Sequence, residues 1–273
     1  MNKIKRILLN KGSSIAYGII STIFMVVPED VFKHGFINCD LSDTKIIVTN
    51  RLILSLIILF LAYIIYHIWR KKRKSVTIDD KNYTITIEYG DITKIDKGKK
   101  VIHFDECFST NVGNRPQDIK PKSVCGQYLT KHPIDNMQNL IQESGIKPIG
   151  ISLYDNQPKY APGMIVPRDK FLLMSFAELD RNGLGNMTYN RYLECLNTLW
   201  QQIDIYHGTD DVYVPILGSK ITRFDKDLNQ QELLDIMISS YKLSPKKMKK
   251  PYVLHIVCNE RENFSLNDVF GVN

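Results

Sequence analysis

The hydrophobic pattern of the chain is dominated by a run of 18 residues without a formal charge at positions 52–69. At 1.5 Å per residue, a helix of this length spans roughly 27 Å, close to the thickness of the hydrocarbon core of a bilayer. Only Ser55 and His67 interrupt the apolar run. A core helix of a soluble domain normally carries a polar face. The pattern therefore favours a transmembrane helix over residues 52–69, and a buried core helix is the less favoured alternative.

A second, weaker apolar run occupies residues 12–27, where 16 residues carry no formal charge. Residues 7–9 extend it if the side chain of Lys11 reaches the interface. The basic residues before this run are also typical of a secretory signal peptide, but the Val-Val-Pro-Glu sequence at 26–29 lacks the small residues of a cleavage site. The two runs together predict a hairpin of transmembrane helices, at about 7–27 and 52–69.

Basic residues flank the predicted hairpin on both outer sides. Lys3, Lys5, Arg6 and Lys11 accompany the start of the first helix, and residues 70–74 read Arg-Lys-Lys-Arg-Lys. The connection at 28–50 is acidic instead, with four acids against two lysines. The positive-inside rule then places both termini in the cytoplasm and the short loop outside, as expected of a multi-pass protein of the inner cell membrane.

The formal net charge of +7 would, on its own, suggest a nucleic-acid partner. Residues 1–74 carry 12 basic and four acidic residues, so residues 75–273 carry a net charge of −1. The basicity is thus a membrane-topology signal, which makes the lipid bilayer the expected partner and argues against nucleic acid. The cysteines and histidines lack the spacing of a metal site, and no metal is expected.

Residues 75–273 alternate between period-two strand patterns and helical patterns. Strands are predicted at 83–87, 100–104, 147–153, 164–177, 212–215 and 252–258, and helices at 133–141, 188–206 and 229–241. Residues 105–132 show no regular period, and a segment of that kind inside a compact domain is usually functional or disordered. Alternating strands and helices indicate an α/β fold. The predicted organisation is a transmembrane hairpin with basic flanks, residues 1–74, and a cytoplasmic domain, residues 75–273.

Two short segments that follow predicted strands have the composition of ligand-binding loops. Gly90-Asp91-Ile92-Thr93 places a carboxylate just past a strand end, although an aspartate there, taken alone, more often caps a turn or a helix. The segment 215–224 reads Pro-Ile-Leu-Gly-Ser-Lys-Ile-Thr-Arg-Phe. Its main-chain amides and hydroxyls can bind phosphate oxygens, with Lys220 and Arg223 adding positive charge. A plain surface turn is the alternative for this second segment.

Taken together and in this order, the two segments resemble the macro domain, an ADP-ribose-binding module with three α/β/α layers. In that family the aspartate of Gly-Asp-Ile-Thr binds the adenine amino group, which implies this role for Asp91, with Ile92 beside it. A Val-x-x-Pro strand, here residues 212–215, leads into the loop around the diphosphate. The resemblance covers roughly residues 83–260. It implies that this loop contacts the ligand through Gly218, Ser219, Lys220, Ile221, Thr222, Arg223 and the aromatic residue Phe224.

The sequence departs from this family around the distal ribose. Macro-domain hydrolases carry Asn-Ala-Ala-Asn after the second strand, where this chain reads Phe-Asp-Glu-Cys-Phe-Ser-Thr-Asn at 104–111. The glycine-rich loop that follows is reduced to Ser-Val-Cys-Gly-Gln-Tyr at 123–128, and Lys220 replaces a usual glycine. The resemblance implies ligand contacts for Asp105, Cys125, Gly126 and Gln127. Loss of the asparagine pair argues against catalysis, which would need a general base and a positioned water, with Asp105, Glu106 and Asn111 as the local candidates.

The divergent pattern at 104–127, together with the predicted hairpin, is similar to the membrane-anchored macro-domain effectors of Thoeris anti-phage systems. In those systems a partner TIR-domain enzyme consumes NAD and makes an ADP-ribose-based signal, histidine-ADP-ribose for the macro-type effectors. The resemblance implies a receptor without a separate cofactor, which binds such a signal, forms a homo-oligomer and disturbs the bilayer. A membrane-anchored ADP-ribose or nucleotide hydrolase and a non-catalytic scaffold are the alternatives.

Overall fold

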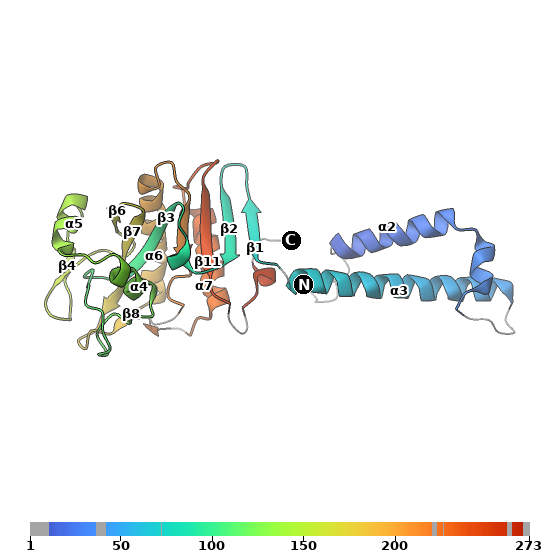
Figure 1. Cartoon of the computed structure of the whole chain (residues 1–273), viewed down its shortest axis with the longest axis horizontal. Helices are drawn as coiled ribbons and strands as arrows, with labels where there is room; N and C mark the ends of the chain where they lie inside the picture. The colour runs from blue at the N-terminus through green and yellow to red at the C-terminus, as the bar shows by residue number, and fades with distance from the viewer. Residues whose placement is uncertain are drawn as a thin grey trace. The chain divides into compact units, whose positions relative to one another are not determined.

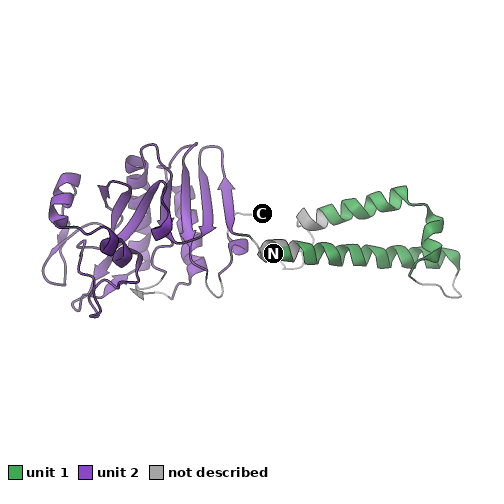
Figure 2. Cartoon of the chain, viewed as in Figure 1, with its two compact units in different colours: residues 1–73, 273 green, residues 74–272 purple. Residues whose placement is uncertain are grey.

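The computed structural model describes residues 11–36, 42–71, 73–219, 223–225, 227–260 and 264–269. The chain forms two compact units, made of residues 1–73 and 74–272 (Figure 2). The boundary between them lies one residue before the predicted one, which follows residue 74. The first unit is helical, and the second is an α/β domain built on one large sheet (Figure 1).

The first unit contains the helix α2 (Lys11–Val26), the 3-10 helix η1 (Glu29–His34) and the helix α3 (Asp43–Lys71). One described helix, over Asp43–Ile65 with a mean hydropathy of 2.2, has the length and composition to cross a membrane. It begins nine residues before the predicted 52–69, because residues 43–51, which mix polar and apolar side chains, continue the helix without a break. The apolar part of α2, Ile15–Val26, is shorter than a bilayer span. The predicted hairpin of two spanning helices is not confirmed.

Polar contacts hold η1 against α3 within the first unit. The Asn50 side-chain amide is almost fully buried and donates a hydrogen bond of 2.8 Å to the carbonyl oxygen of Phe32. The Arg51 guanidinium contacts Glu29 at 3.2 Å and lies over the rings of Phe24 and Phe32, at 5.4 and 5.0 Å from their centroids. These contacts fix the connection between the two helices through a polar end of α3.

The second unit is organised around a sheet of nine described strands in the order β1-β2-β11-β9-β3-β7-β8-β10, with β6 paired to β7. The five strands β2, β11, β9, β3 and β7 are mutually parallel, and β1 adds to the outer edge of β2 in the antiparallel sense. The strand bounds are β1 (Ser75–Asp79), β2 (Thr84–Tyr89), β3 (Lys99–Asp105), β6 (Ile165–Arg168), β7 (Phe171–Leu179), β8 (Gly185–Met187), β9 (Val212–Pro215), β10 (Arg223–Phe224) and β11 (Val253–Cys258). A separate two-stranded sheet pairs β4 (Gly150–Ile151) with β5 (Pro158–Lys159).

Helices cover both faces of this sheet, which gives three α/β/α layers (Figure 1). The helices α6 (Tyr189–Tyr206) and α7 (Gln230–Leu243) share one apolar core with the sheet, and α4 (Val124–Lys131) and α5 (Met137–Ser144) share another. Successive residues of a strand point to opposite faces, so Leu172 enters the first core and Leu173 the second. The macro-like α/β fold predicted from the sequence is therefore present.

Four local predictions differ from the structure. The strand predicted at 147–153 is reduced to β4, Gly150–Ile151, and the side chains of Ile149, Ile151 and Leu153 are exposed. Residues 164–177 are the antiparallel hairpin of β6 and β7 instead of one strand. The irregular segment 105–132 contains the helix α4, and the helix predicted from Pro133 begins at Met137, with Asn136 as its N-cap.

The chain enters the second unit beside the carboxyl ends of the parallel strands. The Lys74 carbonyl accepts a 3.0 Å hydrogen bond from the amide of Tyr89, the last residue of β2. Ser75, the first residue of β1, pairs with Glu88. Because β1 runs antiparallel to β2, its start lies at the same edge of the sheet as the segment Gly90-Asp91.

Candidate functional site

The predicted ligand-binding segments meet at one edge of the sheet. Asp91 follows β2, Gly218 and Ser219 follow β9, and Asp105 ends β3. Because these strands are parallel, all three segments lie at their carboxyl ends, the usual ligand edge of an open α/β sheet. The strand β11 separates β2 from β9. Two strand spacings, about 10 Å, therefore separate the first two segments, and one more leads to the third.

The carboxylate of Asp91 is oriented by its own turn. Its Oδ1 atom accepts hydrogen bonds from the amide and the hydroxyl of Thr93, at 3.0 and 2.8 Å. Its Oδ2 atom lies 3.7 Å from the Lys94 ammonium group, and 41% of the side chain is exposed. Partial burial alone would raise the pKa of Asp91, but the Thr93 hydrogen bonds and the charges of Lys94 and Lys131 together lower it. The side chain is therefore a partly exposed, ionised acceptor whose Oδ2 atom accepts no hydrogen bond within the described part of the chain.

The segment 123–128 lies next to Asp91 through one side-chain contact. The Thr93 hydroxyl is 3.3 Å from Oε1 of Gln127 on α4. The hydroxyl of Ser123 caps this helix by accepting from the Gly126 amide at 3.0 Å. A side chain at Gly126 would overlap the Lys120 carbonyl, so glycine is required there. The structure therefore brings Gln127 to the Asp91 turn, whereas the family resemblance implies a place for this segment at the distal ribose.

The loop after β9 turns at Gly218, which has a φ of +77°. A Cβ atom at this position would overlap the ring of Phe224, so both the conformation and the packing require glycine. The Phe224 ring also contacts that of Tyr192 edge to face, with centroids 5.4 Å apart. The structure thus brings Phe224 against the loop, where Gly218 and Ser219 are partly exposed.

Four predicted residues of this loop have no described side chain. Lys220, Ile221 and Thr222 lie outside the described residues, and Arg223 is described only through its backbone, which pairs with Asn186 in β10 and β8.

Two further predicted residues are buried in apolar surroundings. The Ile92 side chain is 3% exposed and packs with Tyr213 and Val257, so a ligand contact at this position is left to the main chain. Cys125 is 6% exposed in the core under α4, and burial raises the pKa of its thiol well above the usual range. Cys125 is therefore a packing residue of the helix that presents Gln127.

Asp105 closes a tight turn at the end of β3. Its Oδ1 atom accepts hydrogen bonds from the amides of Cys107 and Ser109, at 2.9 and 3.0 Å. The turn holds Phe108 at a φ of +55°, in a region that a bulky residue rarely adopts. Burial raises the pKa of Asp105, although the hydrogen bonds oppose this effect. Strained backbone of this kind persists where surrounding contacts hold it, often beside a functional site.

A buried ionic network lies beside this turn and was missed by the sequence reasoning. The fully buried Glu106 accepts from the Ser152 hydroxyl at 2.7 Å and contacts the Arg191 guanidinium at 3.3 Å. Arg191 also lies 3.9 Å from Glu178, which pairs with Lys159 at 3.3 Å. Glu106 therefore anchors β3 to α6 and is enclosed, whereas Asn111 is exposed on the loop. The distance of 85 residues between Glu106 and Arg191 left no local sequence signal.

No group of three potential metal ligands occurs among the described residues. The four described cysteines are buried free thiols.

The fold was compared with solved structures. A mutant macrodomain of Oceanobacillus iheyensis is 9% identical, with a TM-score of 0.42, and the match covers 69% of this chain and 91% of that one. The macrodomain of Thermus aquaticus DarG is 17% identical, with a TM-score of 0.35, covering 64% of this chain and 97% of that one.

Sequence comparison identifies the family. A curated relative, the Thoeris protein ThsA of Bacillus amyloliquefaciens (strain Y2), is 26% identical over 262 residues, which cover 90% of this chain and 85% of the relative. The family model described as "Thoeris protein ThsA, Macro domain" matches residues 85–259, which hold the sheet from β2 to β11 and every predicted ligand-binding segment. On the strength of this match over more than half its length, the chain belongs to the ThsA macro-domain family of Thoeris anti-phage defence.

Proposed function

We propose that the chain is a membrane-bound Thoeris effector whose macro domain binds an ADP-ribose-derived signal of the histidine-ADP-ribose type. A partner TIR-domain enzyme makes the signal, and its binding drives oligomerisation of the chain and disruption of the membrane. The effector lies in the inner cell membrane with both termini in the cytoplasm. Membership of the ThsA family supports the role in defence, and the geometry of the carboxyl edge supports the ligand class.

The observation that carries the ligand assignment is the carboxylate of Asp91. Thr93 fixes its Oδ1 atom, which leaves Oδ2 to accept a hydrogen bond from an amino group such as that of adenine. The loop at Gly218 lies about 10 Å away along the same edge, a distance on the scale of a nucleotide. The strained turn at Phe108 follows one strand further on, where the distal part of an extended ligand would lie.

The membrane part of the proposal rests on the first unit. The helix over Asp43–Ile65 is long and apolar enough to cross a bilayer, and the basic clusters at 3–11 and 70–74 favour cytoplasmic ends. Oligomerisation would follow if the ligand-bound domain favours one self-association surface, since a ligand shifts an equilibrium toward the state that it binds better.

Isothermal titration calorimetry of the full chain in an uncharged detergent tests the ligand assignment. ADP-ribose, its histidine adduct, cyclic ADP-ribose and NAD are titrated into the wild type, Asp91→Ala and the control Asp96→Ala. Asp96 is an exposed acid five residues further on and makes no hydrogen bond among the described residues. Loss of a hydrogen bond to a charged group is worth about 1.5–3 kcal/mol, so Asp91→Ala should weaken binding about 10- to 150-fold. Absence of binding to all four compounds would refute the ligand class.

The output is tested separately with the chain reconstituted in dye-loaded vesicles. The ligand that binds in calorimetry should release the dye from vesicles carrying the wild type and leave those carrying Asp91→Ala intact. Dye retention despite saturating ligand would contradict the proposed membrane disruption while leaving ligand binding in place.

A further inference from the structure

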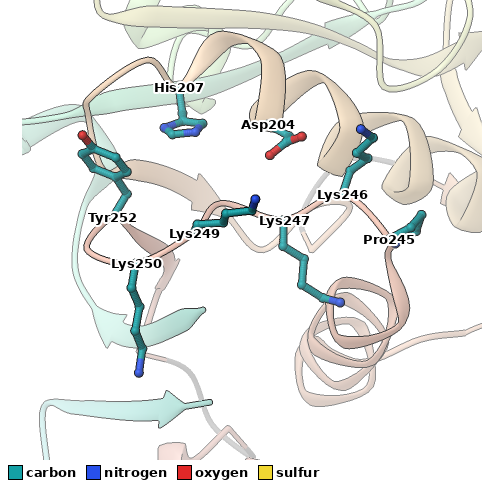
Figure 3. A pocket seen from close by; sticks show the side chains of 8 residues that line it. All are labelled: Asp204, His207, Pro245, Lys246, Lys247, Lys249, Lys250 and Tyr252. Carbon is teal, nitrogen blue, oxygen red and sulfur yellow. The ribbon is translucent and has the colours of Figure 1, made fainter. Parts of the chain in front are cut away.

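A lysine-rich cavity lies at the opposite edge of the sheet from the Asp91 site. It has a volume of about 370 Å³ and is lined by Asp204, His207, Pro245, Lys246, Lys247, Lys249, Lys250 and Tyr252 (Figure 3). The lining residues come from the end of α6 and from the loop that precedes β11, so they lie at the amino ends of the parallel strands. The six residues of β11 span about 20 Å between this edge and the other.

The loop that carries the lysines is held in place by its backbone. The Met248 amide donates to the Tyr241 hydroxyl at 3.1 Å, and the Met248 side chain is buried in the core. The Lys250 amide donates to the carbonyl of Asn82, also at 3.1 Å. The cavity wall is thus fixed on both sides of Lys249, and a ligand would not have to order it.

The four lysines divide into two pairs. Lys250 contacts Asp79 at 2.9 Å, and the Lys247 ammonium donates to the Ser244 carbonyl and lies over the Tyr83 ring. The ammonium groups of Lys246 and Lys249 make no hydrogen bond or ion pair within the described part of the chain. In Figure 3 these two side chains extend to the Asp204 side of the loop, whereas those of Lys247 and Lys250 extend to the other side.

A second polar group of the cavity has no partner. The Nδ1 atom of His207 is buried and makes no hydrogen bond to the described residues. The His207 ring lies against that of Tyr252, with centroids 5.2 Å apart, at the C-terminal end of α6. Buried polar atoms are normally satisfied, so this nitrogen is a second polar group of the cavity lining that the described chain leaves without a partner.

We propose that this cavity is a second binding site of the chain, specific for a phosphate group held by Lys246 and Lys249. Lysine ammonium groups bind phosphate as point charges, and the cavity offers the two unpaired ammonium groups of Lys246 and Lys249 against one carboxylate, Asp204. Residues 236–259 contain no acid, so no neighbour in this stretch of sequence competes for the lysines. The volume lies in the range of small-molecule sites. The phosphate belongs either to a soluble phosphorylated molecule or to the headgroup of an anionic lipid.

The site is tested by calorimetry of the full chain in an uncharged detergent, with inorganic pyrophosphate as the probe. The double variant Lys246→Ala/Lys249→Ala removes the two unpaired ammonium groups, and both residues are exposed, so the fold should persist. The control Lys147→Ala/Lys170→Ala removes the same charge from exposed positions outside the cavity. We expect binding to weaken at least about tenfold in the first variant and to be unchanged in the control. Equal affinity in all these proteins, or no binding, would overturn the proposal.

Amine-reactive labelling followed by mass spectrometry distinguishes the two phosphate sources. The full chain in phosphatidylcholine nanodiscs is labelled with and without pyrophosphate, and again in discs that contain phosphatidylglycerol. Protection of Lys246 and Lys249 relative to Lys147 by pyrophosphate alone supports a soluble ligand. Protection by phosphatidylglycerol without pyrophosphate supports a lipid headgroup. Equal labelling of these lysines under all conditions contradicts the site.

Discussion

The contact between Gly218 and Phe224 allows a quantitative test of the loop that follows β9. In Gly218→Ala, the new methyl group meets two obstacles, namely a φ of +77° and the ring of Phe224. A left-handed conformation costs a non-glycine residue about 1–2 kcal/mol. Forcing a methyl group into a packed site costs about 1–3 kcal/mol more. The free energy of unfolding should therefore fall by about 2–5 kcal/mol.

Gly145 provides a matched control for the backbone part of this effect. It ends α5 with a φ of +71°, and a Cβ atom there meets nothing within 4 Å. Gly145→Ala should therefore lose only about 1–2 kcal/mol. For a domain of this size, 1 kcal/mol corresponds to roughly 2–4 °C in Tm, so Gly218→Ala should melt about 2–12 °C below Gly145→Ala.

The assay is thermal unfolding of the full chain in detergent, followed by the fluorescence of Trp200, which is fully buried against Tyr241. A Trp69→Phe background removes the second tryptophan. In Gly218→Ala/Phe224→Ala the methyl group has room, so its cost should fall to that of Gly145→Ala when Phe224→Ala is the reference. Equal melting of the two glycine variants, or an excess cost that persists without the ring, would refute the packing argument.

Three further predictions concern the ionisable groups of the same edge. Because the pKa of Asp91 is lowered, its contribution to stability is complete above the usual carboxyl pKa near 3.8 and is lost as the pH falls through the folded-state pKa. Thr93→Val removes one of the hydrogen bonds that lower the pKa of Asp91. The urea midpoint should therefore fall less between about pH 5 and pH 3 in this variant than in the wild type. The pKa of Asp105 is raised, so ionisation of its carboxyl group destabilises the fold as the pH rises. Asp105→Asn keeps the acceptor oxygen and should raise Tm at neutral pH, whereas Asp105→Ala removes that oxygen and should lower Tm. A lower Tm for Asp105→Asn would contradict the raised pKa of Asp105. Arg191→Met leaves the charge of Glu106 buried without its cation and should lower the free energy of unfolding in denaturant by about 3–5 kcal/mol. Glu106→Gln should restore part of this loss in the double variant. Additive losses would show that the two side chains are not coupled.

Elements with local signals could be predicted from the sequence. The helix α6 begins after Thr188 and α7 after Asn229, because both side chains cap the next turn and apolar residues follow at helical spacing. The strands β2, β3, β9 and β11 were predicted to within two residues at each end, since they are short apolar runs bounded by turns. These elements carry the carboxyl edge.

Features that depend on distant partners could not be predicted. The apolar residues Ile149, Ile151 and Leu153 have the period-two spacing of a strand. Their local sequence does not show whether another element covers the face that they share, and in the structure these three side chains are exposed. The helix α4 escaped prediction because Gly126 lowers helix propensity, and the need for it comes from the Lys120 carbonyl.

The candidate site shows the same division. Asp91 and Gln127 were found because they belong to short motifs, and their contact through Thr93 required the fold. The net charge of −1 for residues 75–273 averaged over the surface and so concealed the Lys-Lys-Met-Lys-Lys run at 246–250. A scan of local charge would have found it.

The edge strand β1 determines where the chain enters the α/β domain. The five parallel strands all start at the edge that carries the lysine cavity, so a domain that began with β2 would receive the chain there, about 20 Å from Asp91. Because β1 precedes β2 and runs antiparallel to it, the chain enters at the opposite ends of the strands. The chain instead arrives at Lys74, hydrogen-bonded to Tyr89, two residues before Asp91. If the proposed ligand shifts the Asp91 turn, the shift would therefore reach the covalent link at Lys74 through Tyr89, without movement of the intervening core.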